Sequence, residues 1–405
     1  MPSVGWLTTS TIENGEGTLE TIRVARIFDG ERMHREGGVV VISGDATAGG
    51  RISDVRLGEH PRDVDLLDGT LLPGLIDCHV HLCADAGPDA LNRLADDLEP
   101  TIADSLGRHR RAGVTTVRDL GDRRGAVLRR RDPHVLAAGA PLTTPGGHTW
   151  YLGGAVRGVD EIRRAVRSRA ADGADLVKIM ASGGVFTPGT DTAGTQFTDE
   201  EMAAAVDEAH VQGLPITAHA HAHAAIWQAL RAGVDGIEHC TSVTPAGARI
   251  DDELADALAA SGIAVCPTLG SDPAVVVPPE ILAMAERAGL TQAHLQDGVA
   301  RLARAGVTII AGSDAGLGPA KPHGILPRTL EEYVVSGLAP ADALRAATSR
   351  AAEACRITGR TGRIRPGLDA DLLLVPGDPT ADITTLRRPL RVYVARPGTR
   401  DGIDG

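Results

Sequence analysis

Short apolar runs alternate with longer stretches rich in Ala, Glu and Arg from about residue 71 onward. Each apolar run has the length of a buried strand, and the stretches between them have helical spacing, a pattern typical of repeated βα units around a parallel sheet. Eight runs are expected strands: residues 75–82, 114–120, 134–139, 176–181, 216–220, 236–240, 263–269 and 307–313. Eight such strands fit an α/β protein with a (β/α)8 TIM barrel.

Helices are expected between these strands. Thr198 and Glu201 have the spacing of a capping box, and helical alternation continues to His210 before Gly213 ends it. Further helices are expected over residues 160–171, 222–232, 251–260 and 279–305.

The two ends of the chain have a different pattern. Short strands are expected at residues 22–28, 38–42 and 64–67, and again at 371–375 and 390–394. We expect residues 1–70 and 362–405 to form one small β-sandwich-like domain, with the barrel over residues 71–361. Two separate tails packed on the barrel are the alternative, and periodicity does not decide between them.

The composition of the chain limits which binding partners and which cellular compartment we expect. Aromatic residues make up 2% of the 405 residues and the net charge is -12, which argues against nucleic acid and leaves a small-molecule substrate. The five cysteines include no CxxC pair, which indicates a reducing compartment. Residues 1–17 do not resemble a signal peptide and no apolar run could span a bilayer, so we expect a cytoplasmic protein without a membrane partner. A homo-oligomer stays open.

His79 and His81 end the first apolar run of the expected barrel. Alternate side chains of a strand share a face, so both imidazoles point the same way and could grip a metal ion. Taken alone, the pair is explained equally well by packed or surface histidines.

Further polar residues lie at or near the ends of later strands. Lys178 is flanked by apolar residues, and its buried charge requires a partner carboxylate, a metal or a chemical modification. His219 and His221 end the fifth strand, and spacing does not decide which is a ligand. His239 and Asp314 end the sixth and eighth strands. Because active sites of such barrels lie at the carboxyl ends of the strands, these residues are candidates for one metal centre.

These residues occur together with two short motifs, LPGLID at 72–77 and GLDADL at 367–372. The combination resembles the amidohydrolase superfamily, in particular the metal-dependent hydrolases related to imidazolonepropionase and to barrel-type Xaa-Pro dipeptidases. The resemblance covers residues 71–379. It implies two divalent metal ions, for which the ligand types suit zinc and leave manganese, iron and cobalt open.

The resemblance also implies how the ligands divide. One metal is bound by His79, His81 and Asp314, and the other by His219 and His239. Lys178, N-carboxylated by carbon dioxide, and a hydroxide bridge both. The role of His221 is open.

The implied activity is hydrolysis of an amide or related C–N bond, with Asp314 moving the proton from the bridging hydroxide to the leaving nitrogen. A dipeptide or N-acyl amino acid is the leading substrate, followed by a urea, a carbamate or a cyclic amide. His148 is expected to donate a hydrogen bond to the oxyanion. Tyr151, His221 and His323 are further candidate substrate contacts. The alternatives are a mononuclear-type deaminase of a heterocycle and, more remotely, an inactive binding relative.

Overall fold

The computed structural model describes residues 10–14, 17–44, 50–87, 90–95, 97–185 and 187–395. The chain divides into two compact units. The first comprises Met1–Ile76, Arg110–Thr115 and Ala339–Gly405, and the second comprises Asp77–His109 and Thr116–Leu338. The second unit therefore ends before residue 361, the expected end of the barrel.

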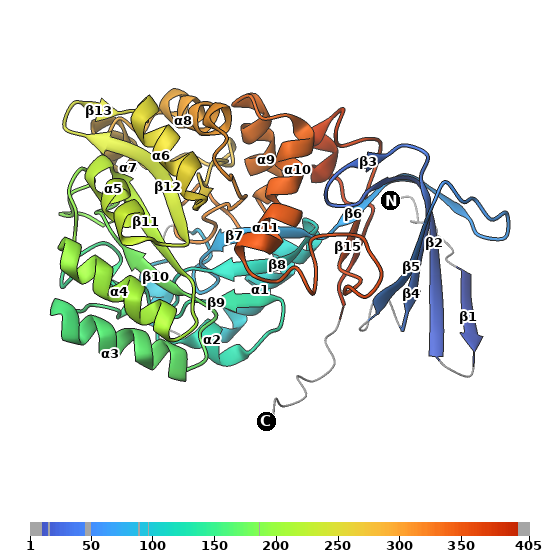
Figure 1. Ribbon diagram of the computed structural model, residues 1–405, viewed down its shortest axis with the longest axis horizontal. Coiled ribbons are helices and arrows are strands. Elements are labelled where there is room, and N and C mark those ends of the chain that lie inside the picture. Colours follow the sequence, from blue (N-terminus) through green and yellow to red (C-terminus); the bar gives the residue numbers. More distant parts are fainter. Residues whose placement is uncertain are drawn as a thin grey trace. The chain divides into compact units, whose positions relative to one another are not determined.

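The first unit contains a sheet built from both ends of the chain (Figure 1). Its strands are β1 (Ser10–Asn14), β2 (Gly17–Phe28), β3 (Met33–His34), β4 (Gly38–Ser43), β5 (Arg51–Leu57), β6 (Leu66–Pro73), β15 (Leu372–Val375) and β16 (Arg391–Tyr393). The order is β16-β15-β6-β2-β4-β5, with β1 and β3 also paired to β2. All eight strands thus belong to one hydrogen-bonded sheet, instead of the two stacked sheets of a sandwich, because β2 pairs with both β4 and β6 and β6 continues to β15. Among the described residues, strands from both ends of the chain pair within this sheet, as β15 does with β6.

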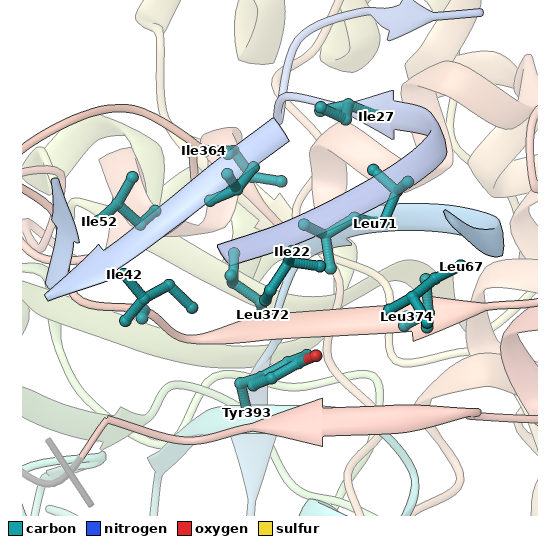
Figure 2. Close-up of a cluster of buried hydrophobic side chains, with 13 residues drawn as sticks. Ile22, Ile27, Ile42, Ile52, Leu67, Leu71, Ile364, Leu372, Leu374 and Tyr393 are labelled. Carbon is teal, nitrogen blue, oxygen red and sulfur yellow. The ribbon is translucent and has the colours of Figure 1, made fainter. Parts of the chain in front are cut away.

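Alternation of side chains explains the core of this sheet. In β2, Ile22 and Val24 are fully buried, and the alternation shifts at an irregularity in the pairing of β2 with β6 before Ile27 is buried in turn. Figure 2 shows Ile22 and Ile27 among side chains of the neighbouring strands, with Leu372 and Tyr393 from the C-terminal part of the chain. The unit also contains α10 (Pro340–Ala346), α11 (Ser349–Ala354) and the short 3-10 helix η3 (Ile383–Arg387).

The second unit has two groups of strands. The first is β7 (Leu75–Val80), β8 (Val114–Asp119) and β9 (Val135–Ala137), of which β7 and β8 begin in the first unit. The second is β10 (Val177–Met180), β11 (Ile216–Ala222), β12 (Gly236–Thr244) and β14 (Ala264–Cys266), which pair in parallel, with β13 (Gly247–Ala248) antiparallel to β12. Single parallel bridges join Leu142 to Ile179, Val265 to Ile309 and Val80 to Ala315. These bridges give the strands a barrel-like order.

The expected eighth strand, residues 307–313, is not a regular strand, and Ile309 within it forms an isolated bridge with Val265. Backbone bonds still join it to its neighbours, because Ile310 N donates to Val265 O and Cys78 N donates to Ala311 O, each at 2.9 Å, whereas Ser313 N donates to the side chain of Asp77. The third and seventh strands are also shorter than expected, with three residues each.

Helices α3 (Gly158–Ala171), α4 (Asp199–Val211), α5 (His223–Ala232) and α6 (Asp252–Ser261) lie outside β10, β11 and β12 (Figure 1). The other helices of the unit are η1 (Asn92–Ala95), α1 (Glu99–Arg111), α2 (Ala126–Arg130), η2 (Trp150–Leu152), α7 (Pro279–Arg287), α8 (Gln292–Ala305) and α9 (Leu326–Val335). The capping box of Thr198 and Glu201 is confirmed. The single helix expected over 279–305 is wrong, because Gly289, at φ +71°, separates α7 from α8.

Candidate functional site

A cavity of about 280 Å³ lies in the second unit, and we call it the central cavity. Histidines from β7 and the position just after it, from β11, from β12 and from the loop after β9 line it, together with Lys178 of β10 and Asp314. The structure therefore brings together all six residues proposed as metal ligands: His79, His81, Lys178, His219, His239 and Asp314.

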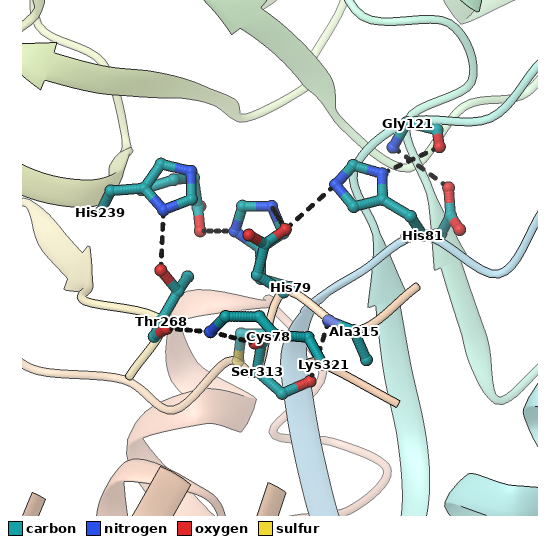
Figure 3. Close-up of polar contacts among 12 residues, drawn as sticks. Cys78, His79, His81, Gly121, His239, Thr268, Ser313, Ala315 and Lys321 are labelled. Carbon is teal, nitrogen blue, oxygen red and sulfur yellow. Dashed lines mark hydrogen bonds and ion pairs between the residues drawn. The ribbon is translucent and has the colours of Figure 1, made fainter. Parts of the chain in front are cut away.

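One group that could hold a metal ion consists of His79, His81 and Asp314. The Nε2 atoms of both histidines lie 3.4 Å from Asp314 Oδ1. The Nδ1 atom of His79 lies 2.8 Å from Glu238 Oε2, and that of His81 lies 3.0 Å from the carbonyl oxygen of Gly121 (Figure 3). Both partners are acceptors, so each Nδ1 donates its proton, and Nε2 is the nitrogen of each neutral ring that can bind a cation.

A second group consists of His219, His221 and His239. The Nδ1 atom of His221 lies 2.9 Å from Thr241 Oγ1, and that of His239 lies 2.7 Å from Thr268 Oγ1. The ring centroids of the three histidines are 4.6 to 4.7 Å apart. The structure thus places both His219 and His221 beside His239. All three histidines are therefore candidate ligands of the second metal ion.

A third group, His79, Glu238 and Cys266, has metal-ligand spacing as well. His79 Nδ1 in this group is already bonded to Glu238. Burial raises the pKa of the Cys266 thiol well above its usual value, so the sulfur stays protonated. The contact with Glu238 therefore fixes the orientation of the His79 ring.

Lys178 is almost completely buried, and its Nζ atom has no hydrogen-bond partner among the described residues. Burial lowers its pKa to about 8, against the opposing effect of Glu238 and Asp314. Its charge also lowers the pKa of His79 and of His239, which belong to different histidine groups. An orphaned amine close to both groups is a nitrogen that can lose its proton and react.

Asp314 carries the negative charge of the site. Burial alone would raise its pKa, but the neighbouring His79 and His81 hold the pKa well below the usual value of an aspartate. Its backbone has φ +58°, and its amide donates to the carbonyl of His79 at 2.8 Å. The carboxylate is therefore ionised and held against the first histidine pair.

His148 and Tyr151 also line the central cavity. Thr187 Oγ1 lies 2.8 Å from His148 Nδ1 and accepts the backbone N–H of Thr149. Burial lowers the pKa of His148 to about 3, so the ring is neutral. At Gly184, a Cβ would lie 2.4 Å from the His148 ring, so this glycine leaves the room that the ring occupies.

His323 does not line the central cavity. Its Nδ1 lies 3.0 Å from His109 Nε2, and its Nε2 lies 2.7 Å from the carbonyl oxygen of Ala84. Both ring nitrogens are engaged in these buried contacts, so we do not retain His323 as a candidate substrate contact.

Sequence reasoning missed Glu238, which is fully buried next to His239 in β12. It accepts hydrogen bonds from His79, from Arg118 Nη2 at 2.8 Å and from Thr217 Oγ1 at 2.7 Å. Burial would raise the pKa of Glu238, but Arg118 and His79 hold it far below its usual value. An acid inside an apolar strand was the available signal.

Lys321 was also missed. It lines the central cavity, and its Nζ donates to the carbonyl oxygens of Thr268, at 2.6 Å, and Ser313, at 2.9 Å (Figure 3). Lys178 and Lys321 are the only lysines in a chain with 41 basic residues, and both face this cavity. Arg118 in β8 donates to Glu238, and Arg123 in the loop after β8 donates to the carbonyl of Tyr151.

Another part of the central cavity's wall is hydrophobic. It includes side chains of α7 and α8 and of the loops beside them: Leu269, Val277, Ile281, Leu282, Ala285, Leu290, Leu295 and Leu317. Polar ligand-like groups thus share the cavity with a broad hydrophobic surface. Among the described residues, no helix is long and apolar enough to cross a membrane.

Known proteins resemble this chain along most of its length. An ochratoxinase of Aspergillus niger is 29% identical over 371 residues, which cover 80% of this chain and 73% of the relative. The crystal structure of a Xaa-Pro dipeptidase with bound methionine in the active site is 28% identical, with a TM-score of 0.80, and the match covers 92% of this chain and 97% of that one. A prolidase complexed with N-methylphosphonate-L-proline is 28% identical, with a TM-score of 0.77 and coverage of 93% and 98%.

These likenesses imply a TIM-barrel-like fold with an additional domain, and the histidine and aspartate groups fit a family that generally binds metal ions. The model of the amidohydrolase family matches residues 70–395. The chain therefore belongs to the amidohydrolase family and is a hydrolase that acts on carbon–nitrogen bonds, amides in particular.

Proposed function

We propose that the protein is a binuclear metal-dependent hydrolase of small amides. His79, His81 and Asp314 would hold one divalent cation, and His219, His221 and His239 the other. Lys178, N-carboxylated by carbon dioxide, would bridge them as an anion. When bound, two such cations, zinc by ligand type, acidify water and polarise a carbonyl.

The observation that carries this proposal is the unpartnered Lys178 amine. A buried ammonium without a partner is costly, and its lowered pKa favours the neutral form that reacts with carbon dioxide. N-carboxylation would remove the positive charge. It would also supply oxygen atoms at a position where the charge of Lys178 lowers the pKa of a histidine in each group. A deaminase with one metal would leave this nitrogen unexplained.

Two side chains would do the proton and oxyanion chemistry. The Asp314 carboxylate would accept a proton from the attacking water and deliver it to the leaving nitrogen. The Thr187 hydroxyl has the backbone N–H of Thr149 as its donor, so its own proton can go to His148 Nδ1. His148 would then carry its proton on Nε2 and donate it to the developing oxyanion.

The cavity favours a dipeptide or an N-acyl amino acid over a urea, a carbamate or a cyclic amide. Lys321 offers a cation for a free carboxylate, and the wall formed by α7 and α8 accommodates an apolar group. The similarity to a Xaa-Pro dipeptidase and a prolidase supports this preference for a dipeptide. Tyr151 lies on the same lining as a further contact.

We further propose that the strands of the second unit close into a (β/α)8 barrel. The bridges of Val265 with Ile309 and of Val80 with Ala315 support this, because they connect the expected seventh, eighth and first strands.

The Asp314→Asn variant tests the proposed activity. Without the carboxylate, kcat for dipeptides or N-acyl amino acids should fall by about 10² to 10⁴-fold, the usual contribution of a general acid–base group. Elemental analysis should find about two metal ions per chain in the unaltered protein. The control is Asp256→Asn, an exposed residue of α6. An active Asp314→Asn enzyme would refute the proton role, and a single tightly bound metal would favour the deaminase.

A further inference from the structure

A second hollow of the same unit, which we call the arginine groove, has a volume of about 640 Å³. It is lined by residues of α2, η2 and α3 and of the loops beside them. Its charged lining consists of one acid, Asp172, and five arginines: Arg123, Arg124, Arg129, Arg131 and Arg169. The local excess of positive charge contrasts with a chain whose net charge is -12.

Four of the five guanidinium groups donate to backbone carbonyls, among them Arg129 to the carbonyl of Arg124. Arg123 Nη1 donates to Tyr151 O at 2.9 Å, and Arg131 Nη2 donates to Asp172 O at 2.7 Å. Arg169 donates to Ala140 O at 2.7 Å and to Ala165 O at 2.8 Å. These bonds orient the groups without neutralising them, because a carbonyl carries no net charge.

Arginines near the groove that do not line it form ion pairs with acidic side chains. Arg130 forms an ion pair with Glu99, and Arg163 lies 3.7 Å from Asp207. No ion pair is found for the five groove arginines among the described residues. Arg169 is also partly desolvated, and burial lowers its pKa to about 10. Asp172 and Asp122 oppose this shift in the pKa of Arg169, but neither forms an ion pair with it, and the five arginines outnumber the one acid of the lining. Such an excess of positive charge attracts anions, and the planar fork of guanidinium matches the oxygens of phosphate.

We propose that the arginine groove binds a small polyanion that carries more than one phosphate group. The volume lies within the usual range of ligand pockets, roughly 300–1,000 Å³, and exceeds what a single phosphate needs. Tyr151 lines both the groove and the central cavity, and its carbonyl accepts from Arg123. An anion in the groove therefore contacts the segment that carries His148 and Tyr151.

Calorimetric titration of the metal-loaded protein with inorganic pyrophosphate tests this site. The double variant Arg124→Gln/Arg129→Gln removes two exposed guanidiniums of the groove, and Arg62→Gln/Arg304→Gln removes two exposed ones elsewhere, with the same change in charge. Because these side chains are exposed, all variants should fold, and equal melting temperatures would verify this. Binding should weaken at least about tenfold in the groove variant only, and should weaken with added salt.

Pyrophosphate also chelates divalent cations, so the heat that remains in the groove variant shows how much arises at the metal centre, and the control variant should keep both contributions. Equal affinity in the two double variants, or no binding to the unaltered protein, would overturn the proposal. Inorganic phosphate should bind more weakly than pyrophosphate, and equal affinity would overturn the requirement for more than one phosphate group. The readout is binding, so the result is independent of the proposed hydrolysis. If the double variant is unstable, Arg169→Lys, which keeps the charge but loses the fork, provides the same comparison.

Discussion

Glu238 connects the metal-binding histidines to the interior of the second unit. Its carboxylate accepts from His79, Arg118 and Thr217, and none of these side chains is adjacent to it in sequence. A carboxylate behind a histidine ligand fixes the tautomer and makes the other ring nitrogen a better donor to a metal. The residue also provides the negative charge that Arg118 needs at this buried position.

Glu238→Gln should therefore damage both stability and metal binding. The amide keeps the shape but leaves the buried Arg118 charge without its counter-ion, at a cost of about 3–5 kcal/mol in the free energy of unfolding. Denaturant unfolding and a metal-affinity titration measure the two effects. Glu253→Gln, at an exposed position of α6, is the matched control. Unchanged stability in Glu238→Gln would show that the pair with Arg118 contributes little.

Lys321 is the residue on which the proposed carboxylate-bearing substrate depends. In Lys321→Met, KM for an N-acyl amino acid should rise by roughly 10 to 100-fold, since a hydrogen bond to a charged group contributes about 1.5–3 kcal/mol. An analogue whose carboxylate is replaced by an amide should lose little. Lys321→Arg keeps the charge and should recover part of the affinity. An equal loss for acid and amide would mean that Lys321 only holds the carbonyls of Thr268 and Ser313.

At the scale of elements, the strand ends around the site depart from regular geometry. His239, Cys240 and Ser242 in β12 have positive φ, and so do Thr268 and Asp314 in neighbouring segments. Such conformations cost about 1–3 kcal/mol each for residues other than glycine and persist where the surrounding packing imposes them. Here they turn His239 and Asp314 toward the central cavity, which an extended strand would not do.

Helix α7 supplies the apolar wall and has no fully buried residue. Ile281→Asp would place a charge on the cavity side, and KM for a substrate with an apolar side chain should rise about tenfold or more, because burial of an Ile side chain contributes about 1.5–3 kcal/mol. Ala283→Asp adds the same charge to the same helix at a position that does not line the cavity. Steady-state kinetics measures KM for both variants. An equal rise in KM in Ile281→Asp and Ala283→Asp would contradict the role of Ile281 in binding the substrate.

For the whole molecule, the proposed metal centre joins residues that are more than 200 positions apart, from His79 to Asp314, within one of two compact units. A ligand that binds only the folded state stabilises it by mass action, by about 4 kcal/mol at a thousand times Kd. Removal of metal with a chelator should therefore lower the melting temperature of the second unit, and added zinc should restore it. A protein with no detectable metal and an unchanged Tm would argue for the inactive binding relative.

Local pattern determined much of this protein from sequence alone. The alternation in β2 and the βα cadence depend on neighbours a few residues apart, and so does the shared face of His79 and His81, which is why these features were predictable. The resemblance to the amidohydrolase superfamily was also predictable, because it depends on the identities of the candidate ligands and of two short motifs, which can be read directly from the sequence.

Other features depended on contacts between distant segments, which periodicity does not encode. Only the tertiary structure placed His221 beside His219 and His239, set Glu238 behind His79, turned His323 away from the central cavity and brought Lys321 into it. The eighth run likewise forms no regular strand, and Ser313 at its end bonds to the side chain of Asp77. In each case the physical reason is the same: the position of a side chain across a sheet depends on register and on packing between segments far apart in the sequence.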